Sequence, residues 1–241
     1  MRNRFVKTAN VSRFLSGVQA IEERGAPEAC LMLVWGEPGF GKSRTGAWWA
    51  THNDALSIRI KAACTPYWVL SDLLRELGIT PAHTCEKAFA QAFDELAKHP
   101  RPIVVDEIEN ALHRDITALE TLRDISDLVE VPILMIGRET VKQRLRQHRQ
   151  IWSRISALVE FGPLSLADVQ LCVDELSEVK VAEAVVAEIH KQSEGRIREV
   201  VKAIKNVERI GHRTADKKVG TDQVKGKVLI HEWQRIGRKA A

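Results

Sequence analysis

This chain of 241 residues has few cysteines, no long apolar segment and no internal repeat. Its four cysteines, at positions 30, 64, 85 and 172, lack the spacing of a metal site, and we expect them to be reduced thiols. No apolar run approaches the roughly 18 residues of a membrane-spanning helix. The basic N-terminus lacks the apolar core of a signal peptide. These absences favour a cytoplasmic protein without a membrane partner.

The composition is that of a globular protein with an uneven distribution of charge. Apolar residues make up 44% of the chain and charged residues 28%, and the net charge is only +4. The segment from Arg196 to Ala241, however, contains thirteen Lys or Arg residues and five Asp or Glu residues, which gives it a net charge of +8. A second basic stretch covers Arg138–Arg154. Such stretches are commonly solvated faces, but two of them favour a polyanionic partner.

A glycine-rich segment gives the strongest functional signal. It reads G-x-x-x-x-G-K-S and comprises Gly36, Glu37, Pro38, Gly39, Phe40, Gly41, Lys42 and Ser43. Apolar Leu31–Trp35 predicts a strand before it, and Arg44–His52 predicts a helix after it. In that setting backbone N–H groups and the helix N-terminus bind nucleotide phosphates. We expect Lys42 to contact the β- and γ-phosphates, Ser43 to ligate Mg²⁺, and Arg44 to complete the nucleotide-binding segment.

A second motif is a short apolar run that ends in two carboxylates, Asp106 and Glu107. Strands of a parallel sheet are buried on both faces, and ligands bind at their carboxyl ends. We therefore expect Asp106 to hold Mg²⁺ through water and Glu107 to polarise the attacking water, which favours hydrolysis. Adjacent acids are more commonly a solvated loop, but the buried strand before them favours catalysis. Because the chain has no N-K-x-D guanine-reading motif, ATP is favoured over GTP.

The apolar patterning predicts an α/β fold with a parallel five-stranded sheet, followed by a small helical domain. The expected strands are 31–35, 56–61, 102–107, 131–137 and 157–161. The expected helices are 11–23, 44–52, 68–77, 84–98, 116–129 and a basic helix or helix pair over 138–152. Only helices are expected later, over 166–176, 181–192, 196–210 and 221–233, with a polar connector at 216–220. The predicted domains are an ATPase core, residues 1–163, and a helical lid with a basic C-terminal tail, residues 164–241.

This plan resembles that of the AAA+ ATPases, and most of all the MuB/TnsC group of transposition proteins, with ExeA-type ATPases as neighbours. Besides the two motifs, the resemblance rests on Thr8–Val11, Thr65–Trp68, Leu70–Gly78 and Val131–Gly137. It implies an AAA+ P-loop ATPase that uses ATP and Mg²⁺. The Mu protein has an additional N-terminal DNA-binding domain, whereas this chain starts almost directly at the core. That function is therefore either missing or supplied by the core and lid.

The roles of two arginines are implied by the resemblance alone. Arg154 matches the arginine finger, which reaches the γ-phosphate of a neighbouring subunit, and the alternative is a surface arginine in a basic helix. Arg198 matches the sensor-2 arginine of the lid, and the alternative is a solvated arginine at a helix start. The sensor-1 position, normally polar, holds Gly137-Arg138 here, so that role stays open.

The resemblance implies an ATPase that assembles on duplex DNA as a ring or helical filament. It would select target DNA for a DDE-type transposase of a phage or mobile element, at the nucleoid of a bacterial host. The candidate DNA contacts, all to phosphates, are His113, Arg114, Arg138 and Lys142. Two alternatives are an assembly or motor ATPase of a secretion system, like ExeA, and an ATP-dependent signalling switch. The basic C-terminal third favours nucleic acid.

Overall fold

The computed structural model describes residues 1–26, 29–112 and 116–230, and the chain divides into two compact units. The sheet unit comprises Val11–Pro38 and Lys42–Phe161. The helical unit comprises Met1–Asn10, Gly39–Gly41 and the chain from Gly162 onward. The first ten residues and three residues of the glycine-rich loop therefore group with the C-terminal part of the chain. Within the described ranges, no helix is long and apolar enough to cross a membrane.

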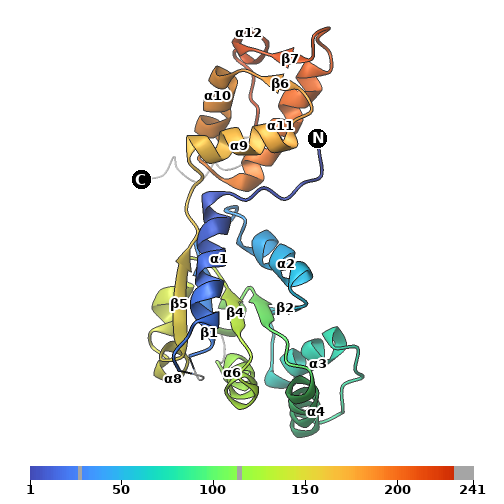
Figure 1. The fold of residues 1–241 in the computed structure, drawn as a ribbon, viewed down its shortest axis with the longest axis vertical. Coiled ribbons are helices and arrows are strands. Elements are labelled where there is room, and N and C mark those ends of the chain that lie inside the picture. Colours follow the sequence, from blue (N-terminus) through green and yellow to red (C-terminus); the bar gives the residue numbers. More distant parts are fainter. Residues whose placement is uncertain (27–28, 113–115, 231–241) are drawn as a thin grey trace. The chain divides into compact units, whose positions relative to one another are not determined.

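The sheet unit contains the five-stranded sheet that the sequence predicts (Figure 1). Its strands are β1 (Leu31–Trp35), β2 (Leu56–Arg59), β3 (Ile103–Asp106), β4 (Ile133–Ile136) and β5 (Ile155–Glu160). They pair in parallel in the order β2-β3-β4-β1-β5. The three inner strands are buried at every residue, whereas the edge strand β2 alternates buried and exposed residues. This difference explains why the inner strands read as continuous apolar runs.

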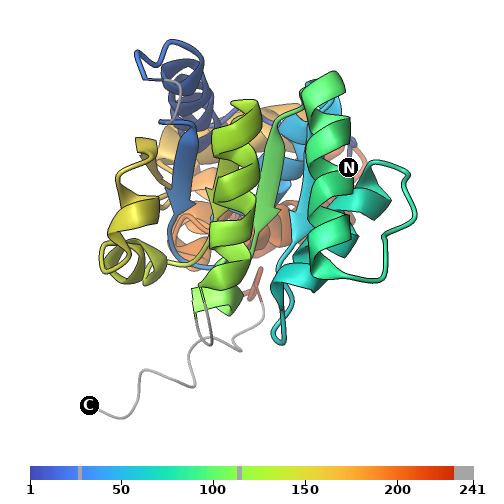
Figure 2. The same cartoon turned by 90° about the horizontal axis from the view of Figure 1, so that it is seen from below.

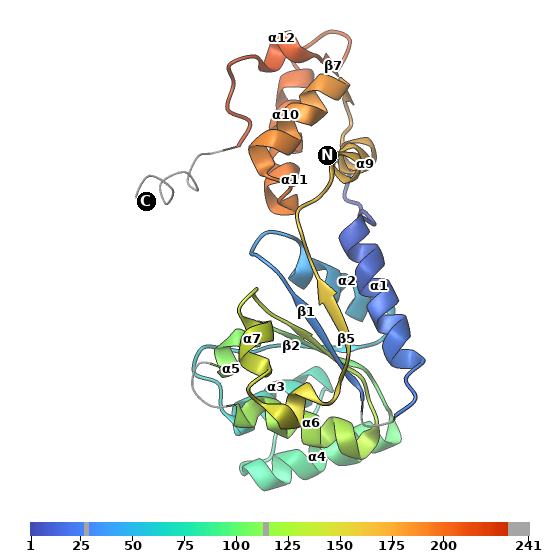
Figure 3. The ribbon, with the colours of Figure 1, turned by 90° about the vertical axis from the view of Figure 1, so that its left-hand side faces the viewer.

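Helices cover both faces of this sheet (Figures 2 and 3). The helices from the start of the chain to β5 are α1 (Ala9–Glu22), α2 (Lys42–His52), α3 (Pro66–Glu76), α4 (Cys85–Lys98), α5 (Glu109–Leu112), α6 (Thr117–Val129), α7 (Val141–Leu145) and α8 (Arg149–Trp152). α1 and α2 lie on one face, where Phe14 and Trp49 make an edge-to-face ring contact. α3, α4 and α6 cover the other face. The basic stretch over 138–152, for which either one helix or a helix pair was expected, forms the two short helices α7 and α8.

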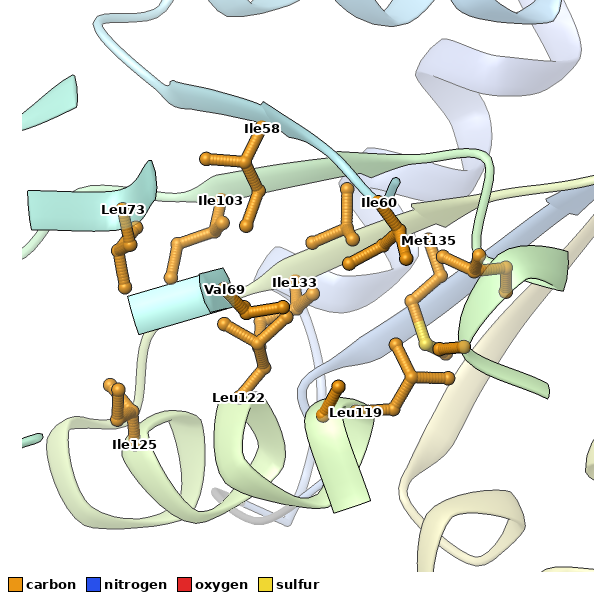
Figure 4. Packing of buried hydrophobic residues seen from close by; sticks show 14 of the residues in the cluster. Ile58, Ile60, Val69, Leu73, Ile103, Leu119, Leu122, Ile125, Ile133 and Met135 are labelled. Atoms are coloured by element: carbon orange, nitrogen blue, oxygen red, sulfur yellow. The ribbon is translucent and has the colours of Figure 1, made fainter. Parts of the chain in front are cut away.

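The main hydrophobic core lies between the sheet and the helices α3 and α6 (Figure 4). Ile103, Ile133 and Met135 project from the strands toward Leu122 of α6 and Val69 of α3. All five side chains are at most 3% exposed. Burial of a side chain of this size contributes roughly 1.5–3 kcal/mol. The core therefore holds rigid the strands whose carboxyl ends carry the candidate site.

The helical unit differs from its prediction in two places. It contains α9 (Leu166–Leu176), α10 (Glu183–Ser193), α11 (Ile197–Gly211) and α12 (Thr221–Val224), but also a parallel pair of strands, β6 (Lys180–Val181) and β7 (Lys218–Val219). The expected connector at 216–220 was wrong because Val219 fills the core of this unit and its backbone pairs with β6. The expected helix over 221–233 is found only over Thr221–Val224: Lys225 leaves the helical region with ψ 125°, and Gly226 follows in a left-handed conformation, φ +71°. Residues 231–233 lie outside the described residues.

The N-terminal segment is bound to the helical unit by its backbone. The Arg2 N–H donates to the Leu176 carbonyl at 2.8 Å, and the Ala9 N–H donates to Asp168 Oδ1 at 2.8 Å. The Asn10 amide makes two reciprocal bonds to the backbone of Gly162, its Nδ2 donating to the carbonyl at 2.8 Å and its Oδ1 accepting from the N–H at 3.2 Å. These long-range bonds explain why residues 1–10 group with a unit far away in sequence.

Candidate nucleotide-phosphate site

The glycine-rich loop connects β1 to α2, which is the strand–loop–helix setting that the motif requires. Gly36, Gly39 and Gly41 have φ values of +149°, +92° and +95°, which side chains rarely adopt. A Cβ at Gly36 would also overlap the carbonyl oxygen of Phe161. Glycine is therefore required here for both conformation and space, and it lets the backbone N–H groups form a concave anion site.

Lys42 is the buried cation of this loop. Its side chain packs at the start of α2, and its Nζ donates to the carbonyl oxygens of Gly36 at 2.6 Å and Glu37 at 2.9 Å. Burial lowers the pKa of Lys42, while the negative charges of Glu109, Glu139 and Asp106 oppose that shift. A buried ammonium is costly without an opposite charge beside it. The residues present therefore fit a bound polyphosphate, whose charge would compensate Lys42.

Ser43 and Asp106 bring two oxygen ligands together from separate elements. Ser43 Oγ, on α2, donates to Asp106 Oδ1 at 3.0 Å at the carboxyl end of β3. Asp106 Oδ1 also accepts from the Glu107 N–H at 3.0 Å, and Arg59 approaches Oδ2 at 3.2 Å. A hydroxyl and a carboxylate beside a phosphate site match the oxygen chemistry of Mg²⁺, which keeps several waters and phosphate oxygens as further ligands. The described ranges contain no cluster of three or more His, Cys, Asp or Glu side chains that could hold a metal.

Glu107 sits directly after β3 in a left-handed conformation, φ +57°. This conformation is unfavourable for a residue with a side chain and is typical of functional sites. Asn110 Nδ2 donates to the Ile60 carbonyl at 2.8 Å and lies 3.5 Å from Glu107 Oε2. On the other side, Arg59 Nε lies 3.9 Å from Glu107 Oε1. Asn110 and Arg59 therefore flank the carboxylate.

Arg59 and Asn110 were not predicted from the sequence. The signal for Arg59 is its position at the end of the alternating strand β2, in register with Asp106 of β3. The signal for Asn110 is its place three residues after Glu107, and in the structure its N–H donates to the Glu107 carbonyl at 3.1 Å across the turn that leads into α5. Neither signal points to a partner until the strand order is known.

Arg138 and Lys142 each have a partner within the sheet unit. Arg138 Nε lies 3.0 Å from Oε1 of the buried Glu109, whose Oε2 accepts from the Arg138 N–H at 3.3 Å. Lys142 Nζ lies 4.2 Å from the ring centroid of Trp35, a cation–π contact. A Cβ at Gly137 would lie 2.5 Å from Val141 Cγ2, which leaves no space there for a polar sensor side chain.

Arg154 is held by its own subunit. Its Nε lies 2.7 Å from Asp127 Oδ2, and its Nη1 donates to the Gln150 carbonyl at 2.9 Å. These partners belong to α6 and α8 rather than to the glycine-rich loop. The structure of one chain therefore does not bring Arg154 together with Lys42.

The remaining predicted residues are placed as follows. Glu37, Pro38, Ser43 and Arg44 are exposed, and Phe40 is buried. Within the helical unit, the exposed Arg198 is the second residue of α11, and its N–H donates to the Gly39 carbonyl at 3.2 Å. The Arg196 guanidinium lies 5.4 Å from the Phe40 ring centroid. His113 and Arg114 lie outside the described residues.

This chain resembles known proteins in part of its sequence and in its fold. A protein-family model described as AAA domain matches residues 27–145. The structure of Orc1 from Aeropyrum pernix in complex with DNA is similar, with a TM-score of 0.62 and 17% identity, over 92% of this chain and 65% of that one. The structure of Cdc6p from Pyrobaculum aerophilum has a TM-score of 0.59 and 15% sequence identity, and the match covers 80% of this chain and 59% of that one. A RuvB variant from Thermotoga maritima has a TM-score of 0.59 and 18% identity, and the match covers 91% of this chain and 69% of that one.

These structural likenesses show the fold alone, because the identities are low. The chain spans less than two thirds of the length of the Orc1 and Cdc6p chains. Among curated proteins, none matches this chain by sequence. The family match over residues 27–145, together with the parallel sheet and the glycine-rich loop, identifies this part of the chain as an AAA-family ATPase domain.

Proposed function

We propose that this protein is an ATP-dependent DNA-binding AAA+ ATPase that oligomerises on duplex DNA and delivers target DNA to a DDE-type transposase. The observation that carries the proposal furthest is the assembled phosphate site, in which Ser43 Oγ and Asp106 Oδ1 lie 3.0 Å apart beside the buried Lys42. The net charge of +8 from Arg196 to Ala241 supports a polyanionic partner. Orc1, a protein of the same fold, is found in complex with DNA. The transposase rests on the resemblance of the sequence to the MuB/TnsC group.

In this proposal the residues of one chain bind and orient ATP for hydrolysis. The loop N–H groups and Lys42 hold the β- and γ-phosphates by hydrogen bonds and charge. Ser43 and Asp106 would hold Mg²⁺, which when bound neutralises charge on the phosphate oxygens. Glu107 accepts a proton from the attacking water. Asn110 and Arg59 orient its carboxylate, since they contact opposite oxygens of it.

A neighbouring subunit would complete the site. Arg154 would reach the γ-phosphate bound by the next subunit, where a guanidinium can form a forked contact with phosphate. Asp127 would orient that arginine through its Nε. Arg198, at the start of α11, would report the bound nucleotide to the helical unit. ATP between subunits then favours assembly, and assembly aligns basic surfaces along DNA.

The test is the binding of fluorescently labelled duplexes of unrelated sequence, measured by anisotropy with ATP, with ADP and without nucleotide. We expect binding that requires ATP, differs little between sequences and falls steeply with salt because counterions are released. Electron microscopy of the ATP sample should show rings or filaments on the DNA. In the Lys42→Ala variant, addition of ATP should no longer increase duplex binding. The control is Lys98→Ala, which changes an exposed lysine of α4 and should bind duplex in the presence of ATP as the original protein does. If ATP-bound protein has no affinity for duplex DNA even at low salt, the proposal is wrong and a secretion-type ATPase becomes the better interpretation.

A further inference from the structure

The helical unit has a surface hollow that the ATPase mechanism does not use. Two cavities of about 410 and 470 Å³ share the lining residues Asn206, Arg209 and Arg213. One wall is the C-terminal half of α11 and the residues directly after it. The other is the segment Lys227–Leu229, which belongs to no helix or strand. We call this region the basic hollow.

Four of the ten residues that line the basic hollow are Lys or Arg: Lys205, Arg209, Arg213 and Lys227. All of these are exposed. The lining also includes one acid, Glu208, whose side chain is only 5% exposed. Its Oε2 lies 3.0 Å from the Met1 ammonium, and its Oε1 accepts from the Glu178 N–H at 2.8 Å. The hollow therefore presents a positive surface to solvent.

The walls of the hollow are held in place by hydrogen bonds. Asn206 Nδ2 donates to the Leu229 carbonyl at 2.7 Å, which fixes the segment Lys227–Leu229 against α11. Asn206 Oδ1 accepts from Arg209 Nη2 at 3.1 Å, which orients that guanidinium. The Leu229 N–H donates to Gln192 Oε1 at 2.9 Å, and the Leu229 side chain is buried in the core of the unit. A preformed basic surface loses less entropy on binding than flexible side chains do.

The spacing of the cations suits a row of phosphates. Lys205, Arg209 and Arg213 follow one another at intervals of four residues along α11 and its end. At a rise of 1.5 Å per residue, the row spans about 12 Å. Each strand of duplex DNA presents one phosphate per about 3.4 Å of its axis, so a row of this length can contact more than one phosphate.

We propose that the basic hollow binds the phosphodiester backbone of duplex DNA, without reading its sequence. This inference rests on the proposed DNA-binding function and names the surface that carries it. Arg138 and Lys142, the contacts expected from the sequence, are engaged by Glu109 and Trp35 within the sheet unit. The basic hollow instead combines several cations in one concave surface, which is the arrangement that phosphate contacts require.

The experiment compares two full-length triple variants that lose the same charge. In Lys205→Ala, Arg209→Ala, Arg213→Ala the row of the basic hollow is removed. The control, Lys180→Ala, Lys191→Ala, Lys218→Ala, removes three exposed lysines of the same unit that do not line the hollow. Duplex binding with ATP is measured by anisotropy at several salt concentrations. Circular dichroism and ATP hydrolysis without DNA check that each variant is folded and active.

We expect the hollow variant to bind duplexes at least about 10-fold more weakly at about 100 mM salt, with a salt slope smaller by about 2–3, and the control to bind like the original protein. Equal binding by the two variants, while the original protein binds, would overturn this inference and leave the proposed function standing. If the original protein binds no duplex DNA, both the inference and the proposed function are wrong. If the hollow variant binds DNA like the original protein but no longer binds a poly-glutamate peptide that the original protein binds, the inference is also overturned, and an acidic protein partner is favoured instead.

Discussion

At the scale of single residues, binding and hydrolysis are assigned to different side chains. Lys42 is buried in the loop and bonded to the carbonyls of Gly36 and Glu37, so it can respond to a phosphate by exchanging these partners for a stronger ionic one. Glu107 lies across the site, held between Asn110 and Arg59. A base for water contributes to the rate and little to the affinity for ATP.

We therefore expect Lys42→Ala to abolish ATP binding, and Glu107→Gln to bind ATP normally but hydrolyse it about 10²-fold or more slowly. Binding is measured with a fluorescent ATP analogue, and turnover by phosphate release. The matched control for Glu107 is Glu76→Gln, an exposed acid at the end of α3, which should hydrolyse ATP at the original rate. Near-normal hydrolysis by Glu107→Gln would remove the catalytic assignment.

At the scale of elements, the junction between β1 and the glycine-rich loop depends on one close approach. Gly36 combines a φ of +149° with a position against the carbonyl of Phe161, whose N–H in turn donates to the Trp35 carbonyl at 2.8 Å. A side chain here would force apart the ends of β1 and β5. The carbonyl is backbone, so it cannot move as easily as the end of a side chain.

Gly36→Ala should lower the free energy of unfolding of the sheet unit by about 2 kcal/mol or more, since strain and overpacking each contribute roughly 1–3 kcal/mol. Urea unfolding followed by tryptophan fluorescence measures this change. Gly25→Ala is the control: a Cβ at Gly25 would meet no atom of the described residues within 4 Å, and the change should stay within about 0.5 kcal/mol. Equal stability of the two variants would contradict the role given to Gly36.

At the scale of the whole molecule, the position of Arg154 has a consequence for assembly. In one chain this arginine is bonded to Asp127 and Gln150, so its proposed action on ATP requires a second subunit. A shared site of this kind can be tested by mixing two inactive variants, because each supplies what the other lacks.

Lys42→Ala and Arg154→Ala should each hydrolyse ATP at a few per cent of the original rate or less. In an equal mixture, about a quarter of the interfaces pair an intact loop with an intact arginine, and hydrolysis should recover in proportion. Phosphate release is measured in mixtures shown by crosslinking to co-assemble. Arg149→Ala, which changes an exposed arginine of α8, should be active without mixing. A mixture that co-assembles without recovery would argue against an arginine acting in trans.

The local features of the fold could be predicted from the sequence. The apolar run of Leu31–Trp35 and the glycines after it specify a strand and a phosphate loop within a dozen residues, and the structure has both where expected. The inner strands were predictable because burial on both faces leaves a continuous apolar signal. The short β6–β7 pair was not, since two residues give no periodic pattern and the pairing joins positions about forty residues apart.

The sequence by itself thus determined which groups are candidates for the proposed chemistry: a loop for phosphates, Ser43 and Asp106 for a metal, and Glu107 for water. These assignments depend on residue types within short segments, where local geometry suffices. Only the tertiary structure decided the partners of the candidate residues, such as Arg59 beside Glu107, Glu109 beside Arg138 and Asp127 beside Arg154. Those partners come from the strand order and from helix packing, and the basic hollow likewise exists only because Asn206 bonds a segment more than twenty residues away to α11. Side-chain charge is visible in a sequence, but whether a charge is paired or available depends on the fold.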